Sequence, residues 1–157
     1  AGGVKSISAV TGILAHDRIE VEDTAVAALE FTNGALGTIE GTTAAWPGFL
    51  KRIEISGTAG TIMLEEDNIV TWRFAEERPE DEAIRRKFSA KDTVGGGAAD
   101  PKAIKFDKHQ YNFEAFVQAL DRGEKPALDG REGRKAVEMI LAVYAAAKKG
   151  AKVTLPL

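Results

Sequence analysis

Short β-type runs alternate with turn signals over the first half of the chain. Between Val4 and Phe74 the segments VKSISAVTGIL, DTAVAALEFT, ALGTIEGTTA, LKRIEISG, GTIMLEE and NIVTWRF are rich in β-branched residues and are separated by short connections. Parallel strands need long crossover connections, so short ones favour antiparallel pairing. We therefore expect about six strands in a mostly antiparallel sheet.

The segment AALEFTNGALGTIEG, residues 27–41, fits a β-hairpin whose loop decides which side chains share a face. A two-residue turn at Asn33 and Gly34 would mix apolar and polar residues on both faces. A three-residue loop, with Gly34 in the left-handed conformation as a β-bulge, sorts them instead, and we prefer that register. The apolar face then carries Ala25, Ala27, Leu29, Phe31, Ala35, Gly37, Ile39 and Gly41, and the polar face carries Thr24, Val26, Ala28, Glu30, Leu36, Thr38, Glu40 and Thr42.

The last third of the chain has helical periodicity. A first helix is predicted from the apolar stripe Phe113, Phe116, Val117 and Leu120, with Asp107 and Gln110 as a capping box and Gly123 at its end. A second helix is predicted from a cap at Asp129 and Glu132, an end at Gly150, and the stripe Val137, Ile140, Leu141 and Tyr144. Both stripes are expected to cover the apolar face of the sheet, and KVTLPL is expected to add a final edge strand.

Between the sheet and the helices lies the mixed-charge segment 75–101, which contains VGGGAADP. We interpret it as a long loop with a short helix around residues 81–88. Its glycine triplet is a weak signal for nucleotide binding, because no buried strand precedes it and no helix of the dinucleotide-binding type follows.

The polar face of the hairpin has no cover in this pattern. We expect it to continue on the next strand as Arg52, Glu54 and Ser56, while Ile53 and Ile55 point inward. A solvated sheet face is one interpretation, since antiparallel sheets tolerate it. The other is an oligomer interface formed by Thr38, Glu40, Thr42, Arg52 and Glu54.

Composition narrows the classes of function. The 157 residues suit one domain, and the net charge of −3 gives no electrostatic footprint for nucleic acid or for an anionic membrane. There is no cysteine, no membrane-spanning apolar run and no leader pattern, which favours the cytoplasm, and the missing start methionine favours a piece of a longer chain. The fold class we predict is α+β, an open-faced and mostly antiparallel sheet with helices covering one face.

Candidate chemistry is sparse. His16 and Asp17 are adjacent, so a strand would point them to opposite faces, and we expect structural or solvated roles for them and for the carboxylates Glu20, Glu22 and Asp23. His109 at the start of a helix is interpreted as a surface or capping residue, or as a substrate hydrogen-bonding group. The loop WPGF places Trp46 and Phe49 at a strand end, where binding residues often lie, although simple packing of Trp46 is also open. No metal, nucleotide or catalytic motif is complete, so no catalytic, cofactor-binding or metal-binding residue is assigned.

The succession VEDTAVAALEFTNGALGTIEGTT, IEISGTAGTIMLE, HQYNFEAFVQAL and DGREGRKAVEMILAVYAAAKKGAKVTLP resembles the C-terminal domain of the Gfo/Idh/MocA oxidoreductase family (glucose-fructose oxidoreductase, inositol dehydrogenase, rhizopine catabolism) over nearly the whole chain. The resemblance implies that residues 1–157 form one C-terminal domain of an NAD- or NADP-dependent dehydrogenase. Its substrate would be a sugar, a polyol or a related hydroxy compound.

The same resemblance implies that the cofactor is bound by an N-terminal Rossmann domain outside this chain, together with the family's Glu-Lys-Pro and Asp-x-x-x-His elements. It implies that the loop of Trp46 and Phe49 borders the substrate cleft, that the open sheet forms a homo-oligomer, and that the chain alone is inactive. A free-standing binding or assembly module with the same fold is the alternative, because a fold does not fix a function.

Overall fold

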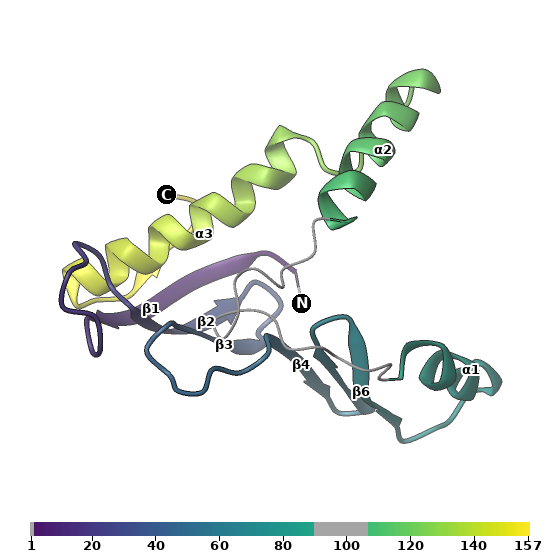
Figure 1. Ribbon diagram of the computed structural model, residues 1–157, viewed down its shortest axis with the longest axis horizontal. Coiled ribbons are helices and arrows are strands. Elements are labelled where there is room, and N and C mark those ends of the chain that lie inside the picture. Colours follow the sequence, from purple (N-terminus) through teal and green to yellow (C-terminus); the bar gives the residue numbers. More distant parts are fainter. Residues whose placement is uncertain (1, 90–106) are drawn as a thin grey trace. The chain divides into compact units, whose positions relative to one another are not determined.

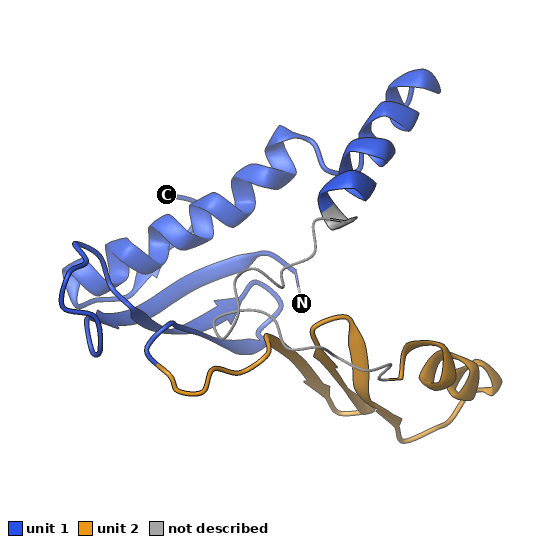
Figure 2. Cartoon of the chain, in the orientation of Figure 1, with its two compact units in different colours: residues 1–44, 105–157 blue, residues 45–104 orange. Residues whose placement is uncertain are grey.

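The computed structural model describes residues 2–89 and 107–157, except for the side chains of residues 107 and 108. The chain divides into two compact units, one made of Ala1–Ala44 with Lys105–Leu157 and the other of Ala45–Ile104 (Figure 2). Open antiparallel sheets and helices make up both units, as the predicted α+β class requires.

The first unit contains a four-stranded antiparallel sheet (Figure 1). Its strands are β1 (Val4–Gly12), β2 (Thr24–Phe31), β3 (Leu36–Thr42) and β7 (Val153–Thr154), in the order β3-β2-β1-β7. The C-terminal strand lies at the edge of the sheet, next to Pro156, as predicted.

The β2–β3 hairpin has the predicted register. Thr24 pairs with Thr42 and Ala27 pairs with Ile39, and the intervening residues follow the same alternation. Gly34 has a φ of 86°, and its N–H donates to the carbonyl of Phe31 over 3.0 Å. The left-handed turn that only glycine adopts at low cost therefore sets which side chains reach the core.

The core of this unit lies between the sheet and α3 (Gly130–Lys149), which packs along β1 (Figure 1). Small side chains dominate the helix face that contacts the sheet, because Ala142, Val143 and Ala146 are buried there. The full set of buried apolar residues is Ile7, Ala27, Leu29, Ala142, Val143, Ala146 and Val153.

The predicted apolar stripe of α3 does not cover the sheet. Its members are 44–59% exposed and point away from the buried face: Val137, Ile140, Leu141 and Tyr144. The prediction was wrong because α3 has apolar residues on two sides, and the alanine side permits the closer approach to the sheet. Both predicted ends are correct: the Asp129 carboxylate accepts hydrogen bonds from the N–H groups of Arg131 and Glu132, and Gly150 ends the helix with a φ of 60°.

The helix α2 (Asp107–Asp121) also departs from the prediction. The helix makes no contact with a described strand comparable to that of α3. The residues of its apolar stripe are exposed: Phe113, Phe116, Val117 and Leu120. The predicted cap at Asp107 lies outside the described side chains.

The second unit holds a separate three-stranded antiparallel sheet, in the order β4-β5-β6, followed by α1. These elements are β4 (Arg52–Gly57), β5 (Gly60–Glu65), β6 (Asn68–Phe74) and α1 (Pro79–Phe88). We expected β4 to continue the first sheet beyond β3, and that was wrong, because β4 pairs with β5 alone. Ile53 and Ile55 are not buried as expected, since every residue of β4 is exposed.

A buried carboxylate joins α1 to β6. Asp81 accepts a 2.8 Å hydrogen bond from the Trp72 indole and a 2.7 Å bond from the Arg78 N–H, which begins the helix. The Arg78 hydrogen bond and then that of Trp72 hold the pKa of Asp81 below its usual range. The short helix predicted around residues 81–88 is thus confirmed. Residues 90–101 of the predicted loop, including the glycine triplet, lie outside the described residues.

Candidate functional site

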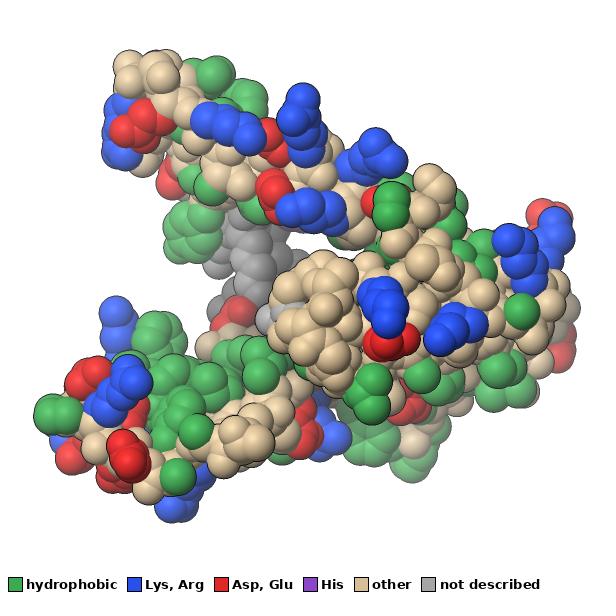
Figure 3. All heavy atoms as spheres, turned by 180° about the vertical axis from the view of Figure 1, so that it is seen from behind, with side chains coloured by type: hydrophobic (Ala, Val, Ile, Leu, Met, Phe, Trp, Pro, Cys, Tyr) green, Lys and Arg blue, Asp and Glu red, His purple; other side chains and the backbone are tan. Residues whose placement is uncertain are grey.

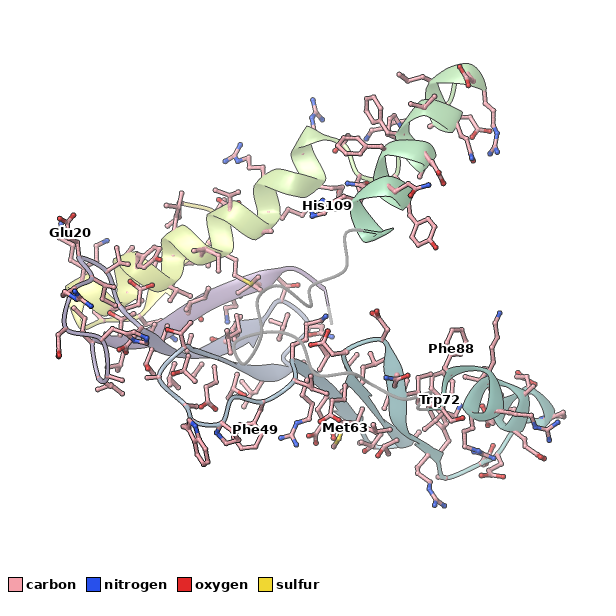
Figure 4. The ribbon with its side chains drawn as sticks, in the orientation of Figure 1. Glu20, Phe49, Met63, Trp72, Phe88 and His109 are labelled. Atoms are coloured by element: carbon pink, nitrogen blue, oxygen red, sulfur yellow. The ribbon has the colours of Figure 1, made fainter. Side chains whose placement is uncertain are left out.

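Two aromatic side chains stand on the loop between β3 and β4. Trp46 is 92% exposed, and Phe49, which is labelled in Figure 4, is 79% exposed. The Trp46–Pro47 peptide bond, which lies between the two aromatic residues along the chain, is cis. Packing within the described residues therefore does not account for either ring, and both present wide apolar faces to an incoming molecule.

Hydrogen bonds fix both ends of this aromatic loop. At its start, the N–H of Thr43 donates to the carbonyl of Asp23, and the N–H of Ala44 donates to the Thr42 hydroxyl. At its end, Lys51 pairs with Glu66 through an ammonium–carboxylate contact of 2.7 Å. The start of the loop is thus held within the first unit and its end within the second.

His109 lies in the first turns of α2, with an exposed side chain (Figure 4). It belongs to the first unit, whereas Trp46 and Phe49 belong to the second. The structure brings the two aromatic residues onto one loop, and their relation to His109 stays a prediction.

The uncovered side of the four-stranded sheet, called here the open sheet face, carries Thr38 and Glu40 as predicted, both exposed. The hydroxyls of Thr24 and Thr42 are 2.9 Å apart across β2 and β3. Arg52 and Glu54 lie on the sheet of the second unit, so the predicted single patch with β3 is not formed by one continuous sheet. Exposed apolar residues also lie on this face: Val26 and Leu36, which the predicted register placed here, and Val10 of β1, which we had not assigned to it.

Asp23 has a more specific structural role than the sequence analysis assigned to it. Its buried carboxylate accepts hydrogen bonds from the successive N–H groups of Leu14, Ala15 and His16, and from the Thr24 hydroxyl. The Ala15 bond, with those of Leu14 and His16, holds the pKa of Asp23 far below its usual range against the opposing effect of burial. The signal available was its place at the end of a loop, immediately before a strand.

The histidine ring of this loop also contacts Asp23. The Nδ1 atom of His16 lies 3.1 Å from the Asp23 carboxylate, so the partner of His16 is Asp23 and not its neighbour Asp17. A second contact holds the loop to α3, because the Tyr144 hydroxyl donates to Glu22 over 2.7 Å. These contacts fix the shape of the loop between β1 and β2, in keeping with the structural role that we expected for its charged residues.

The second unit also contains a cleft of about 530 Å³ beside α1. Its apolar lining includes Trp72, Phe74 and Ile84, and its charged residues include Glu76, Glu77 and Arg78. Trp72 and Phe74 meet edge to face with ring centroids 5.3 Å apart. The polar atoms of Asp81 in this cleft are already bonded to Trp72 and Arg78, so they are engaged in fixing the fold.

A nicotinamide dinucleotide does not fit the βα connections of the described residues. Pyrophosphate sites need a strand that leads through a glycine-rich turn into a helix N-terminus. Among the described residues, β6 is the strand followed directly by a helix, and the connection is AEER, with two glutamates and no glycine. None of the described helices is long and apolar enough to cross a membrane.

Comparison with protein families gives one match over nearly the full length. Residues 2–155 match the model described as the oxidoreductase family, C-terminal alpha/beta domain, of the Gfo/Idh/MocA group. Myo-inositol 2-dehydrogenase of Thermotoga maritima is 29% identical over 126 residues, which are 80% of this chain and 33% of that protein.

Solved structures of similar fold include two kinds of dehydrogenase. WlbA dehydrogenase from Bordetella pertussis, solved with NADH and UDP-GlcNAcA, is 32% identical with a TM-score of 0.77, and the match covers 99% of this chain and 41% of that one. Levoglucosan dehydrogenase, solved with NADH and levoglucosan, shares the fold at 20% identity and a TM-score of 0.72, over 99% of this chain and 46% of that one. The chain thus spans less than half of the length of each of these relatives.

Proposed function

Since the chain belongs to the Gfo/Idh/MocA oxidoreductase family as its C-terminal alpha/beta domain, we propose that it is the substrate-recognition and oligomerisation domain of an NAD(P)-dependent dehydrogenase. The substrate class is a sugar, a polyol or a related hydroxy compound. The observation that carries this proposal is the likeness over 99% of the chain to a dehydrogenase that was solved with NADH and a nucleotide sugar. The inositol dehydrogenase relative supports the same substrate class.

In the proposed enzyme, the cofactor supplies the hydride chemistry between a hydroxyl-bearing carbon and the nicotinamide ring. The residues of this chain position the substrate. The exposed rings of Trp46 and Phe49 suit the apolar faces of a sugar ring, and the His109 imidazole suits a hydroxyl group as a hydrogen-bond partner. Positioning of this kind lowers the barrier by reducing the entropy lost on reaching the reactive geometry.

The open sheet face is proposed to meet the same face of a second subunit. Its threonines offer methyl groups for packing and hydroxyls for hydrogen bonds, and Val10, Val26 and Leu36 supply the apolar contact. A twofold contact brings the same patch of two subunits together. On a surface of mixed polarity, opposite charges of the two subunits can then be paired without like charges meeting.

The function is tested on the full-length polypeptide encoded by the reading frame that contains this chain. Reduction of NAD⁺ and NADP⁺ is followed by nicotinamide absorbance with myo-inositol, with free aldoses and with UDP-linked sugars. We expect turnover with one of these classes. If none of them supports reduction and the polypeptide binds no dinucleotide, the chain is a binding or assembly module, and the proposal is wrong.

The role of the aromatic loop is tested by Trp46→Ala. We expect kcat/KM for the hydroxy substrate to fall about tenfold, equal to about 1.4 kcal/mol of lost transition-state binding, with the cofactor KM unchanged. Leu14→Ala is the matched control, because Leu14 is comparably exposed and lies on the loop between β1 and β2, outside both proposed surfaces. Equal kinetics for both variants would remove Trp46 from the substrate site.

A further inference from the structure

The loop between β1 and β2 is built around one buried carboxylate. The Asp23 side chain has no exposed surface, and it accepts hydrogen bonds from the Thr24 hydroxyl and from three successive main-chain N–H groups: Leu14, Ala15 and His16. A carboxylate offers about four acceptor positions, so these donors already satisfy it. The ring of His16 is therefore not required to satisfy the buried charge.

The His16 ring nevertheless contacts the same carboxylate. Its Nδ1 atom lies 3.1 Å from Asp23, and the side chain is 45% exposed. Because an ionised carboxylate only accepts hydrogen bonds, Nδ1 carries the proton, and Nε2 of the neutral ring is left as an acceptor. Nε2 has no hydrogen-bond partner among the described residues. Carboxylates orient histidine rings in the same way in metal centres and in catalytic triads, where the other ring nitrogen acts on a ligand or a substrate.

Asp23 also holds the start of the aromatic loop. Its main-chain carbonyl accepts the N–H of Thr43 over 2.9 Å. Its carboxylate accepts the Thr24 hydroxyl, which lies 2.9 Å from the Thr42 hydroxyl, and the oxygen of Thr42 accepts the N–H of Ala44 over 3.0 Å. The exposed imidazole and the start of the aromatic loop are therefore fixed by one residue, at the end of the sheet where β1 and β3 end and β2 begins.

We propose that His16 is a further substrate-binding residue, whose Nε2 atom accepts a hydrogen bond from a hydroxyl group of the substrate, and that Asp23 positions its ring. The inference rests on the proposed function, because the aromatic loop is the proposed substrate-binding element. Trp46 follows Ala44 by two residues, and two extended residues span at most about 7 Å. Covalent geometry thus keeps the main chain of Trp46 close to the network around Asp23.

The charges of the β1–β2 loop favour a neutral ligand group over an anion. Four carboxylates and one guanidinium lie within residues 13–23 and give this loop a net charge of −3: Asp17, Arg18, Glu20, Glu22 and Asp23. Such a field repels a phosphate or a carboxylate and tolerates a hydroxyl group. On the face drawn in Figure 3, Lys and Arg side chains lie among Asp and Glu side chains, so that face offers no field of one sign either. The group bound by His16 is therefore a hydroxyl of the sugar or polyol.

Two substitutions of His16 separate a binding role from a structural one. An asparagine places its amide nitrogen near the position of Nδ1, so His16→Asn keeps the hydrogen bond to Asp23 and removes the acceptor at Nε2. A glutamine is longer, so His16→Gln restores an acceptor near the position of Nε2. In the full-length polypeptide we expect kcat/KM for the hydroxy substrate to fall about tenfold in His16→Asn, mainly through KM, and to return to within about threefold of the wild type in His16→Gln.

Stability and cofactor binding are the readouts that separate the two roles. We expect His16→Asn to leave the Tm and the Kd for NADH unchanged, and Val21→Ala, an exposed position on the same loop, to leave the kinetics unchanged as well. Wild-type kcat/KM in His16→Asn overturns the inference. A loss of kcat/KM that comes with a lower Tm and is not restored by glutamine assigns His16 to the fold and overturns it too.

The positioning role of Asp23 is tested by a double-mutant cycle. Asp23→Asn is expected to raise the KM for the hydroxy substrate in the wild type and to raise it much less in His16→Asn, because Asp23 acts through the ring. Equal effects in the two backgrounds would remove Asp23 from this role.

A last test needs no substitution. Diethyl pyrocarbonate acylates an accessible neutral imidazole nitrogen, and mass spectrometry of the digested full-length polypeptide reads the label at His16. We expect the hydroxy substrate that supports turnover to reduce this labelling at least about threefold, because a bound ligand covers the groups that it contacts, and NADH alone to leave it unchanged. Equal labelling with and without that substrate overturns the inference.

Failure of the proposed function gives a different result. The wild-type polypeptide then reduces neither dinucleotide with myo-inositol, free aldoses or UDP-linked sugars, and the inference falls with it. A wild type that turns over one of these substrates, while the substrate does not protect His16 and His16→Asn has wild-type kinetics, retains the proposed function and refutes the inference alone.

Discussion

The two uncovered surfaces of the first unit differ in a way that their shared core does not explain. The open sheet face mixes threonine and glutamate with single apolar residues. The outward side of α3 carries a row of large apolar side chains: Val137, Ile140, Leu141 and Tyr144. Both are supported by the same seven buried residues, among which the three from α3 are alanines and a valine. The two surfaces therefore differ in kind: the outward side of α3 is apolar throughout, and the open sheet face is of mixed polarity.

The largest effect is expected from a substitution in the core, because both surfaces depend on the packing of the core. Ile7 is fully buried at 0% exposure, so Ile7→Ala should lower the free energy of unfolding by about 2–5 kcal/mol. Urea unfolding measures it, and Val21→Ala on the exposed loop after the same strand is the control, with an expected change below about 0.5 kcal/mol. Comparable losses for both would mean that the core does not lie between β1 and α3.

A smaller effect is expected from a change that separates the two surfaces. Thr38→Arg places an unpaired charge on the open sheet face and should raise the Kd of the dimer at least about tenfold. This corresponds to about 1.4 kcal/mol of dimerisation free energy, and α3 should be unaffected. Sedimentation equilibrium compares it with Thr43→Arg, which lies just beyond the end of β3. If the wild type is monomeric at high concentration, or Thr38→Arg dimerises as well as the wild type, the open sheet face is only solvated.

The smallest effect is expected at the loop between β1 and β2, which contacts α3 through the hydrogen bond from Tyr144 to Glu22. The pKa of Asp23 is lowered in the folded chain, so its stabilising contribution is fully present above the unfolded pKa of about 4 and is lost as the pH falls toward the lower folded value. Asp23→Asn should therefore reduce the Tm by a few degrees at neutral pH, and the gap from the wild type should close in acid. Asp17→Asn on the same loop is the control, with no change expected. A gap that does not narrow below about pH 4 would assign the loss to packing and not to the charge.

Local features of the fold could be predicted from the sequence. Gly34 fixed the hairpin loop, and the alternation of apolar and polar residues then allowed a single register. The ends of α3 followed from Asp129 and Gly150, because capping depends on neighbouring residues only. Each of these predictions used information within a few positions.

Non-local features could not be predicted in this way. The strand β4 follows β3 along the chain, yet it pairs with β5, and the alternation of Arg52, Ile53 and Glu54 is the same in either sheet. The stripe of α3 was assigned to the core because larger residues were expected to be buried, whereas Ala142 and Ala146 permit the closer packing. The candidate site shares this limit, because Trp46 and Phe49 could be recognised on one loop but not related to His109 on α2.

The central claim is that this chain supplies substrate recognition and assembly while the cofactor is bound elsewhere in the polypeptide. The most direct measurement is a calorimetric titration of NADH and NADPH into the 157-residue chain, beside the full-length polypeptide encoded by the same reading frame. We predict binding by the full-length polypeptide and no measurable heat of binding for the chain alone. Micromolar binding of either dinucleotide to the chain alone would contradict the account.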